Sequence, residues 1–284
     1  MMHDGGAGGP YAGKIALVTG AGRRRGIGRA VALELARGGA DVVVHGSVRP
    51  PDADEQARGW HGAASVAEEI RALGRRAVAI EVDFSERDAP AELVSRAHDE
   101  LGPVTLLVNN AGTGVGTGGG DIVELADEDW HTGVAVNLSA VYGCCKAAIP
   151  AMLEAGAGAV VNVSSLAGLR ARPRYGPYCA TKFAVVGLTQ QLALEFAPTV
   201  RVNCVCPGLT ATDMVVGTFT RTEKRLEMAP GSLREEVTAK VPLQRFADPD
   251  EMAAVIGFLL SGGSSYITGQ SIAVDGGMDL VSSS

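Results

Sequence analysis

Short runs of apolar and β-branched residues alternate with longer stretches of helical periodicity along most of this chain. That alternation is typical of βαβ units built around a parallel sheet. It predicts strands at residues 15–19, 41–45, 77–82, 104–109, 159–164, 200–206 and 271–274. Between them it predicts helices at residues 27–37, 65–73, 89–100, 128–153, 177–196 and 249–260.

Most of the predicted strands are almost purely apolar, as expected for strands covered by helices on both faces. We therefore expect an α/β fold, a single-domain, Rossmann-type, doubly wound parallel sheet of about seven strands. The length of 284 residues fits one domain, because open α/β sheets commonly run to roughly 250 residues as a unit. The ligand of such a sheet lies beyond the carboxyl ends of its strands.

Two segments stand outside this alternation. Residues 1–12 are rich in glycine, and we expect a flexible tail ahead of a domain that spans residues 13–284. Residues 213–240 are amphipathic and are interpreted either as a substrate loop or as a surface insertion.

The formal net charge of −7 disfavours nucleic acid and anionic membranes as partners. No apolar run approaches the roughly 20 residues that span a bilayer, and no signal pattern opens the chain, so we expect a cytoplasmic protein. The five cysteines form no CxxC pair and have no histidines at metal-ligand spacing. Buried reduced thiols are favoured over disulfides, and no metal site is predicted.

The first predicted strand ends in a glycine-rich turn, which reads TGAGRRRGIG over residues 19–28. A predicted helix follows directly, so its N-terminal amides and dipole would meet a pyrophosphate that the glycines let approach. Glycine spacing alone is weak evidence among 38 glycines, but the position between strand and helix favours a dinucleotide site. The predicted contacts are Gly20, Gly22, Arg25, Gly26, Ile27 and Gly28.

The end of the second strand bears on which dinucleotide the turn would take. NAD sites usually place a carboxylate there to bind the ribose hydroxyls. This chain has none over residues 45–49, where Ser47 and Arg49 could instead hold a 2′-phosphate through charge-assisted hydrogen bonds. We therefore predict NADP(H) as the cofactor, with NAD(H) as the alternative.

Tyr178 and Lys182 lie four residues apart in a predicted helix and so share one face. A free phenol has a pKa near 10, and a neighbouring ammonium group would make it a usable proton carrier at neutral pH. Ser165 follows a strand thirteen residues earlier, where its hydroxyl could hold a reacting oxygen. The Tyr-x-x-x-Lys spacing alone is common on exposed helices, so the prediction depends on the motifs around it.

With these motifs in order from residue 13 to about residue 280, the chain resembles the short-chain dehydrogenase/reductase family. The resemblance implies that Tyr178 exchanges a proton with the substrate oxygen and that Ser165 orients this oxygen. Lys182 would hold the nicotinamide ribose and lower the tyrosine pKa, while Asn137 would bend its helix and hold a water. The further cofactor contacts that it implies are Asp83, Phe84, Asn110, Ala111, Gly112, Pro207, Gly208, Thr210 and Thr212, besides Tyr178 and Lys182.

Two features depart from the family pattern. Five residues separate Gly20 from Gly26, where the family usually has three. Residues 49–62 form a longer polar excursion than usual, which would either cover the adenosine end of the cofactor or pack on a neighbouring subunit.

The family resemblance implies hydride transfer between NADP(H) and a small-molecule carbonyl or alcohol, similar to 3-oxoacyl-carrier-protein reductases around residues 241–246. Steroid, sugar, polyol and polyketide reductases share these motifs, so the substrate stays open. A silent nucleotide-sensing regulator would be expected to lack one of the four residues Asn137, Ser165, Tyr178 and Lys182. An epimerase would carry a larger C-terminal domain. The resemblance also implies a homotetramer or a dimer.

Overall fold

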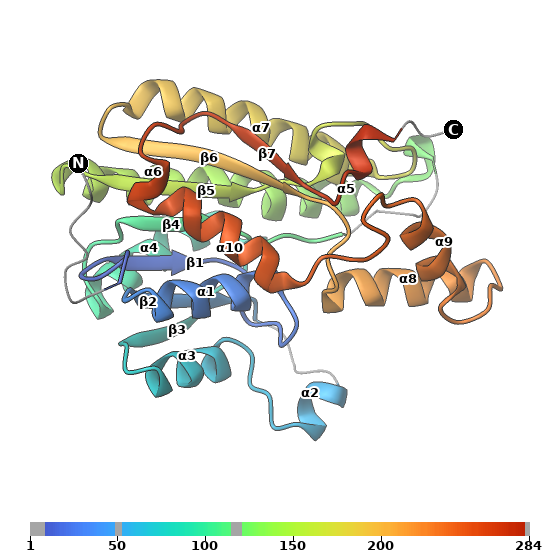
Figure 1. Cartoon of the computed structure of the whole chain (residues 1–284), viewed down its shortest axis with the longest axis horizontal. Coiled ribbons are helices and arrows are strands. Elements are labelled where there is room, and N and C mark those ends of the chain that lie inside the picture. The colour runs from blue at the N-terminus through green and yellow to red at the C-terminus, as the bar shows by residue number, and fades with distance from the viewer. Residues whose placement is uncertain (1–8, 49–52, 115–120, 282–284) are drawn as a thin grey trace.

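The computed structural model describes residues 9–48, 53–114 and 121–281, and within them seven strands form one parallel sheet. The strand order is β3-β2-β1-β4-β5-β6-β7, so the winding direction reverses between β1 and β4 (Figure 1). This confirms the predicted doubly wound, Rossmann-type fold. The strands are β1 Ile15–Val18, β2 Asp41–Gly46, β3 Ala77–Glu81, β4 Leu106–Asn109, β5 Gly158–Val163, β6 Val200–Pro207 and β7 Ser271–Val274.

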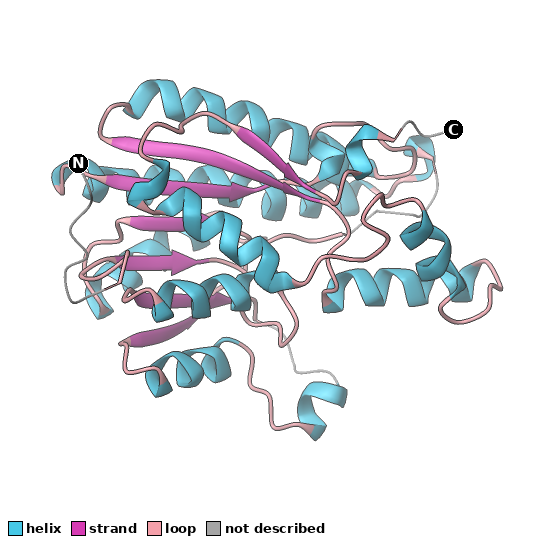
Figure 2. Cartoon of the chain, in the orientation of Figure 1, coloured by secondary structure: helices cyan, strands magenta, loops and turns pink. Residues whose placement is uncertain are grey.

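Helices cover both faces of the sheet (Figure 2). Successive strand residues point to opposite faces, so Ala16 and Val18 pack in one apolar core while Leu17 packs in the other. The first core is closed by α1 Ile27–Arg37, α3 Ala63–Ala72 and α10 Pro249–Leu260. The second core is closed by α4 Ala89–Glu100, α6 Ala140–Glu154 and α7 Gly176–Phe196.

The segment predicted as one helix over residues 128–153 is continuous but irregular. It comprises α5 Asp127–Val134, a π-helical turn Ala135–Ser139 and then α6. By length and composition alone, this stretch could cross a membrane. Its apolar residues include Ala148 and Met152, which are fully buried in the second core, so packing against the sheet accounts for part of the hydropathy.

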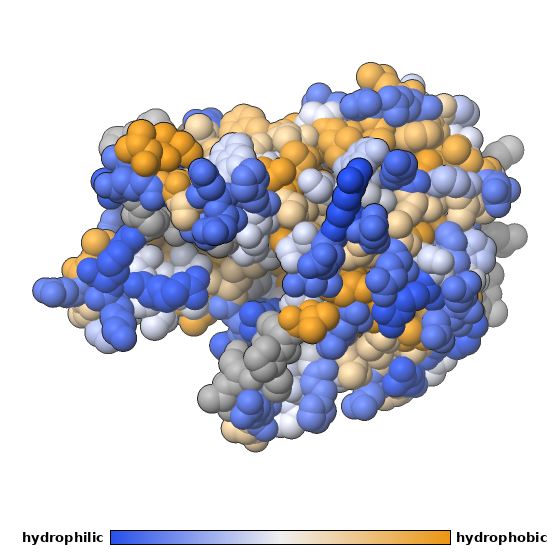
Figure 3. Space-filling model, turned by 180° about the vertical axis from the view of Figure 1, so that it is seen from behind, coloured by the Kyte–Doolittle hydropathy of each residue, from blue (hydrophilic) through white to orange (hydrophobic). Residues whose placement is uncertain are grey.

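The amphipathic segment over residues 213–240 forms two helices, α8 Asp213–Arg225 and α9 Ser232–Ala239. They make a lobe that stands out from the body of the molecule (Figures 1 and 3). A short helix that was not predicted, α2 Ala53–Ala57, lies inside the polar excursion.

The N-terminal boundary differs from the prediction of a tail over residues 1–12. The side chain of Tyr11 is only 4% exposed, and its backbone N–H donates to the carbonyl of Gly38 at 2.9 Å. Its ring fills the space beside Gly38, where no side chain would fit. Since burying an aromatic ring adds apolar area to the first core, the packed chain begins before residue 13. Residues 1–8 lie outside the described chain.

Candidate active site

The glycine turn between β1 and α1 lies against the carboxyl end of β4. Gly20 has a φ of +66°, and a Cβ there would come within 2.6 Å of the Cα of Ala111. A Cβ on Gly28 would lie 2.6 Å from both the Asn110 amide nitrogen and the Gly20 carbonyl oxygen. Only glycine fits at either position. Gly26 precedes α1 and has no side chain to cap it, which leaves the first amides of the helix to a ligand.

Thr19 and Asn110 fasten this turn to β4. The Thr19 hydroxyl accepts from the backbone N–H groups of Asn110 and Ala111, both at 3.0 Å. The Asn110 side-chain amide donates to the carbonyls of Thr19 at 2.9 Å and Gly20 at 3.1 Å. The two predicted motifs, one after each strand, therefore form one rigid unit at the switch point of the sheet.

His45 supports the same turn from the end of β2. Its Nδ1 accepts from the N–H of Gly20 at 3.1 Å, and its Nε2 lies 3.2 Å from the Val82 carbonyl. A neutral ring with its proton on Nε2 satisfies both bonds. The ring stacks on Phe84 at 4.3 Å between centroids. Burial lowers the pKa of His45 to about 4, so the ring is neutral at physiological pH.

Arg25 was predicted as a cofactor contact, and the structure pairs it with the start of α8. Its backbone N–H and its Nε donate to the Asp213 carboxylate at 3.0 and 2.9 Å. The N–H of Asp213 donates back to the Arg25 carbonyl at 2.9 Å. The longer turn thus contacts the α8–α9 lobe.

The polar excursion packs on the chain's own glycine turn. The indole N–H of Trp60 donates to the carbonyl of Gly22 at 2.8 Å. Glu55, which is 4% exposed, pairs with Arg23 at 3.7 Å. Of the two residues predicted to hold a 2′-phosphate, Ser47 is exposed just beyond β2, while Arg49 lies outside the described residues.

The remaining predicted cofactor residues also follow the carboxyl ends of strands. Asp83 is exposed beyond β3, and its carboxylate accepts from the N–H of Ser85 at 2.9 Å. The Phe84 ring is buried beneath it against His45. Beyond β6, whose last residue is Pro207, Gly208 has no room for a side chain beside Asp275. Thr210 is buried, and the Thr212 hydroxyl caps α8 by accepting from Val215 at 3.3 Å.

Tyr178 and Lys182 face each other on α7, with the Lys182 Nζ 5.6 Å from the centroid of the phenol ring. The ammonium group donates to the Val163 carbonyl at 2.9 Å. Burial lowers the pKa of Lys182 to about 8 and raises the pKa of Tyr178 above its usual value. The nearby Ser165 hydroxyl lowers the tyrosine pKa in turn, so the two hydroxyls lie close to each other.

Asn137 lies in the π-helical turn between α5 and α6 and is buried. Its side chain accepts from the N–H of Thr113 at 2.8 Å and donates to the Thr113 carbonyl at 3.0 Å. A Cβ on Gly112 would lie 3.2 Å from the Asn137 oxygen and 3.7 Å from the Lys182 Nζ. The π turn brings Asn137 beside Gly112, which follows β4, and beside Lys182. Such wider helical turns are often found at functional sites.

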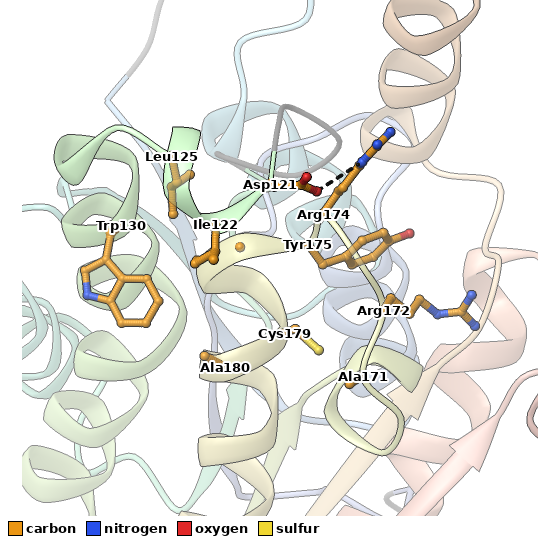
Figure 4. Close-up of a pocket in the computed structure, with 11 residues that line it drawn as sticks. Asp121, Ile122, Leu125, Trp130, Ala171, Arg172, Arg174, Tyr175, Cys179 and Ala180 are labelled. Atoms are coloured by element: carbon orange, nitrogen blue, oxygen red, sulfur yellow. Dashed lines mark ion pairs between the residues drawn. The ribbon is translucent and has the colours of Figure 1, made fainter.

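A cavity of about 420 Å³ adjoins this cluster, lined by residues before and within α5 and by the segment that leads into α7 (Figure 4). Tyr175 has no lysine four residues after it in the sequence. It lines this cavity, and its ring centroid lies 6.1 Å from that of Tyr178. Cys179 also lines it, and its thiol donates to the Ala167 carbonyl at 3.0 Å. The cavity therefore adjoins Tyr178 through its neighbours Tyr175 and Cys179.

Two contributors to the site were missed in the sequence. His45 is a polar residue within the apolar run of β2, and this interruption was the signal in the sequence that could have marked it as part of the site. Arg172, which lines the cavity, has no local motif that marks it.

The fold and the site together define a class of protein, the NAD(P)-dependent oxidoreductases that act on a carbonyl or a secondary alcohol. The glycine cradle, which a Cβ would fill, and the open amides of α1 fit a dinucleotide. A family profile described as enoyl-(acyl carrier protein) reductase matches residues 20–279. The chain belongs to the short-chain dehydrogenase/reductase family.

Relatives of known name support this membership. The chain is 36% identical to the 3-oxoacyl-acyl-carrier-protein reductase FabG of Thermotoga maritima, over 94% of this chain and 98% of that protein. It is 35% identical to the FabG of Staphylococcus aureus, over 93% and 98% of the two chains. Among solved structures, a variant of actinorhodin polyketide ketoreductase with NADPH has a TM-score of 0.82 and 34% identity, over 94% and 98%.

The buried His45 makes the stability of this fold sensitive to acid. The unfolded chain binds a proton at the ordinary histidine pKa of about 6.5, whereas the folded chain resists protonation down to a pKa of about 4. Stability therefore falls as the pH drops from 6.5 towards 4, by about 2 kcal/mol at pH 4.5 from this group. Urea unfolding at pH 6.5 and 4.5 measures the loss.

The variant H45Q has no titrating ring and should lose less stability over the same interval. H61Q removes an exposed histidine and should keep the wild-type pH dependence. An equal loss in H45Q and the wild type would show that burial does not hold the His45 ring neutral.

Proposed function

We propose that this protein is an NADP(H)-dependent ketoreductase that interconverts a ketone and a secondary alcohol on a 3-oxoacyl-type substrate. The observation that carries the proposal is the convergence of Tyr178, Ser165 and Lys182 at the carboxyl edge of the sheet. The names of the FabG relatives and of the actinorhodin ketoreductase support a 3-oxoacyl or polyketide substrate.

The cofactor supplies the hydride when it is bound. As the substrate oxygen gains negative charge, the Tyr178 hydroxyl donates its proton to it, while the Ser165 hydroxyl orients it. The Lys182 ammonium group, next to the phenol ring, stabilises the tyrosinate that forms. Asn137 holds the segment around Thr113 beside the lysine.

The dinucleotide would be held by the groups that line the carboxyl edge. Gly20, Gly22, Gly26 and Gly28 would admit the pyrophosphate, and Lys182 would bind the nicotinamide ribose. Ser47 would contact the 2′-phosphate and Asp83 the adenine. The carboxamide would contact the segment over residues 207–212.

We also propose that the protein is cytoplasmic and homo-oligomeric. The five cysteines are free thiols, which suits a reducing compartment. Large apolar side chains on α6 and α7 are exposed, including Tyr142 at 52%, Phe183 at 43% and Leu194 at 84%. Exposed apolar faces of this kind are typical of subunit interfaces.

The substrate class is tested by following NADPH absorbance with acetoacetyl and crotonoyl thioesters, cyclic ketones and ketosteroids. We expect the acetoacetyl thioester to be reduced and the crotonoyl thioester, which offers a carbon–carbon double bond, to be a poor substrate. Reduction of the crotonoyl thioester alone would replace the ketoreductase assignment with an enoyl reductase.

Removal of the phenol hydroxyl should stop the proton transfer. We expect Y178F to lower kcat by about a hundredfold or more while the Kd for NADPH stays within about twofold, because only the acid–base group is lost. Stopped-flow turnover and fluorescence titration measure the two quantities. Y266F, which changes a fully exposed tyrosine, is the control. Near-normal turnover in Y178F would exclude Tyr178 from catalysis.

A carboxylate at the end of β2 should change the cofactor. We expect S47D to lower kcat/KM for NADPH at least about tenfold relative to NADH, because the new charge repels the 2′-phosphate. S47A removes the hydroxyl without adding charge and should have a smaller effect. If the wild type oxidised NADH far faster than NADPH, the cofactor assignment would be wrong.

The apolar face on α6 and α7 should hold the oligomer together. We expect the wild type to elute as a dimer or a tetramer and L194E to dissociate it, because a buried carboxylate without a partner opposes association. Size-exclusion chromatography with light scattering measures the mass. L226E places the same charge on the α8–α9 lobe and should leave the mass unchanged. A monomeric wild type would contradict this interface.

A further inference from the structure

The cavity beside Tyr178 has two chemically different ends. Ile122, Leu125 and Trp130 form an apolar end, and Arg172 and Arg174 form a cationic end (Figure 4). The Tyr175 ring lies between them in this view (Figure 4). A volume of about 420 Å³ is in the range of small-molecule sites.

Three arginines stand at alternate positions before α7, and they differ in their partners. Arg170 pairs with Asp279 at 2.6 Å, and Arg174 pairs with Asp121 at 3.5 Å. Arg172 makes no hydrogen bond or ion pair with any residue that the structure describes. Residues 115–120, which lie outside the described chain, read VGTGGG and contain no acidic residue.

The lining of the cavity therefore carries two guanidinium groups and one carboxylate, a net charge of +1 from Arg172, Arg174 and Asp121. The chain as a whole has a net charge of −7, so the charge of the cavity lining is opposite in sign to the net charge of the protein. Arg172 is half-buried, and a partly desolvated guanidinium without a partner gains free energy from a bidentate anion.

We propose that this cavity binds the end of the substrate remote from the reacting carbonyl, an apolar body that terminates in an anionic group paired with Arg172. The inference rests on the proposed ketoreductase function and narrows its substrate class. The carbonyl lies at Tyr178 and Ser165, the apolar body lies against Trp130 and its neighbours, and the anion is a carboxylate or a phosphate.

The test compares three aryl ketones that share one body. 4-Acetylbenzoate carries a carboxylate, 4-acetylphenyl phosphate carries a phosphate, and methyl 4-acetylbenzoate is neutral. We expect the wild type to have a kcat/KM at least about tenfold higher for one of the anions than for the ester, mainly through KM. The preferred anion identifies the source of the charge. In R172Q the preference should fall about tenfold.

R96Q is the matched control, because it removes an exposed arginine on α4 that already pairs with Glu92. It should keep the wild-type preference. Calorimetric titration of the same three ketones into the NADP+-saturated protein gives a second readout that does not require turnover. In that titration the anions should bind the wild type more tightly than R172Q.

The outcomes separate this inference from the proposed function. Reduction of the ester without any preference for the anions would leave the ketoreductase intact and overturn the anionic site. An anionic preference that R172Q retains would also overturn it. If no ketone were reduced but the calorimetric preference for anions disappeared in R172Q, the site would stand and the ketoreductase function would fail.

Discussion

The buried ammonium group of Lys182 is the constraint around which the candidate site is built. One backbone carbonyl, that of Val163, accepts from it, and the phenol of Tyr178 lies alongside it. Burial lowers the lysine pKa only to about 8, so the group keeps most of its charge at neutral pH. Burial also raises the tyrosine pKa, so the phenol starts protonated. In the proposed reduction this protonated phenol would be the proton donor, and the cation beside it would stabilise the tyrosinate that forms.

The dinucleotide turn reaches this pair because the sheet reverses its winding beside β1. At that switch point the ends of β1, β2 and β4 meet, and the glycine turn bonds to both neighbours through His45 and Asn110. A side chain on Gly20 would clash with Ala111, and one on Gly28 would clash with the Asn110 amide and the Gly20 carbonyl, so this close packing requires glycine at both positions. The parallel topology thus brings the glycine turn and the residues after β4 to the edge of the sheet where open α/β folds bind their ligands.

Much of this could be predicted from the sequence because the relevant signals are local. Strands buried on both faces read as apolar runs, and a spacing of four residues on a helix places Tyr178 and Lys182 on one face. The α2 helix was missed because its five residues are polar and without periodicity. Tyr11 was assigned to a tail because its packing partner, Gly38, lies beyond α1 in the sequence and no local pattern marks the contact. The role of His45 depends on Val82, a remote carbonyl that no pattern marks.

The contact that Arg25 makes could not be predicted from the sequence either. Its partner Asp213 lies 188 residues away, and their three hydrogen bonds join the phosphate turn to the first residue of α8. The Thr212 hydroxyl caps that helix beside the segment proposed to contact the nicotinamide. Because the Asp213 carboxylate already accepts from the Arg25 guanidinium, it would compete with a cofactor phosphate for this side chain. Arg25 lies in the turn that is two residues longer than the family pattern, so this departure coincides with a contact between the glycine turn and the α8–α9 lobe.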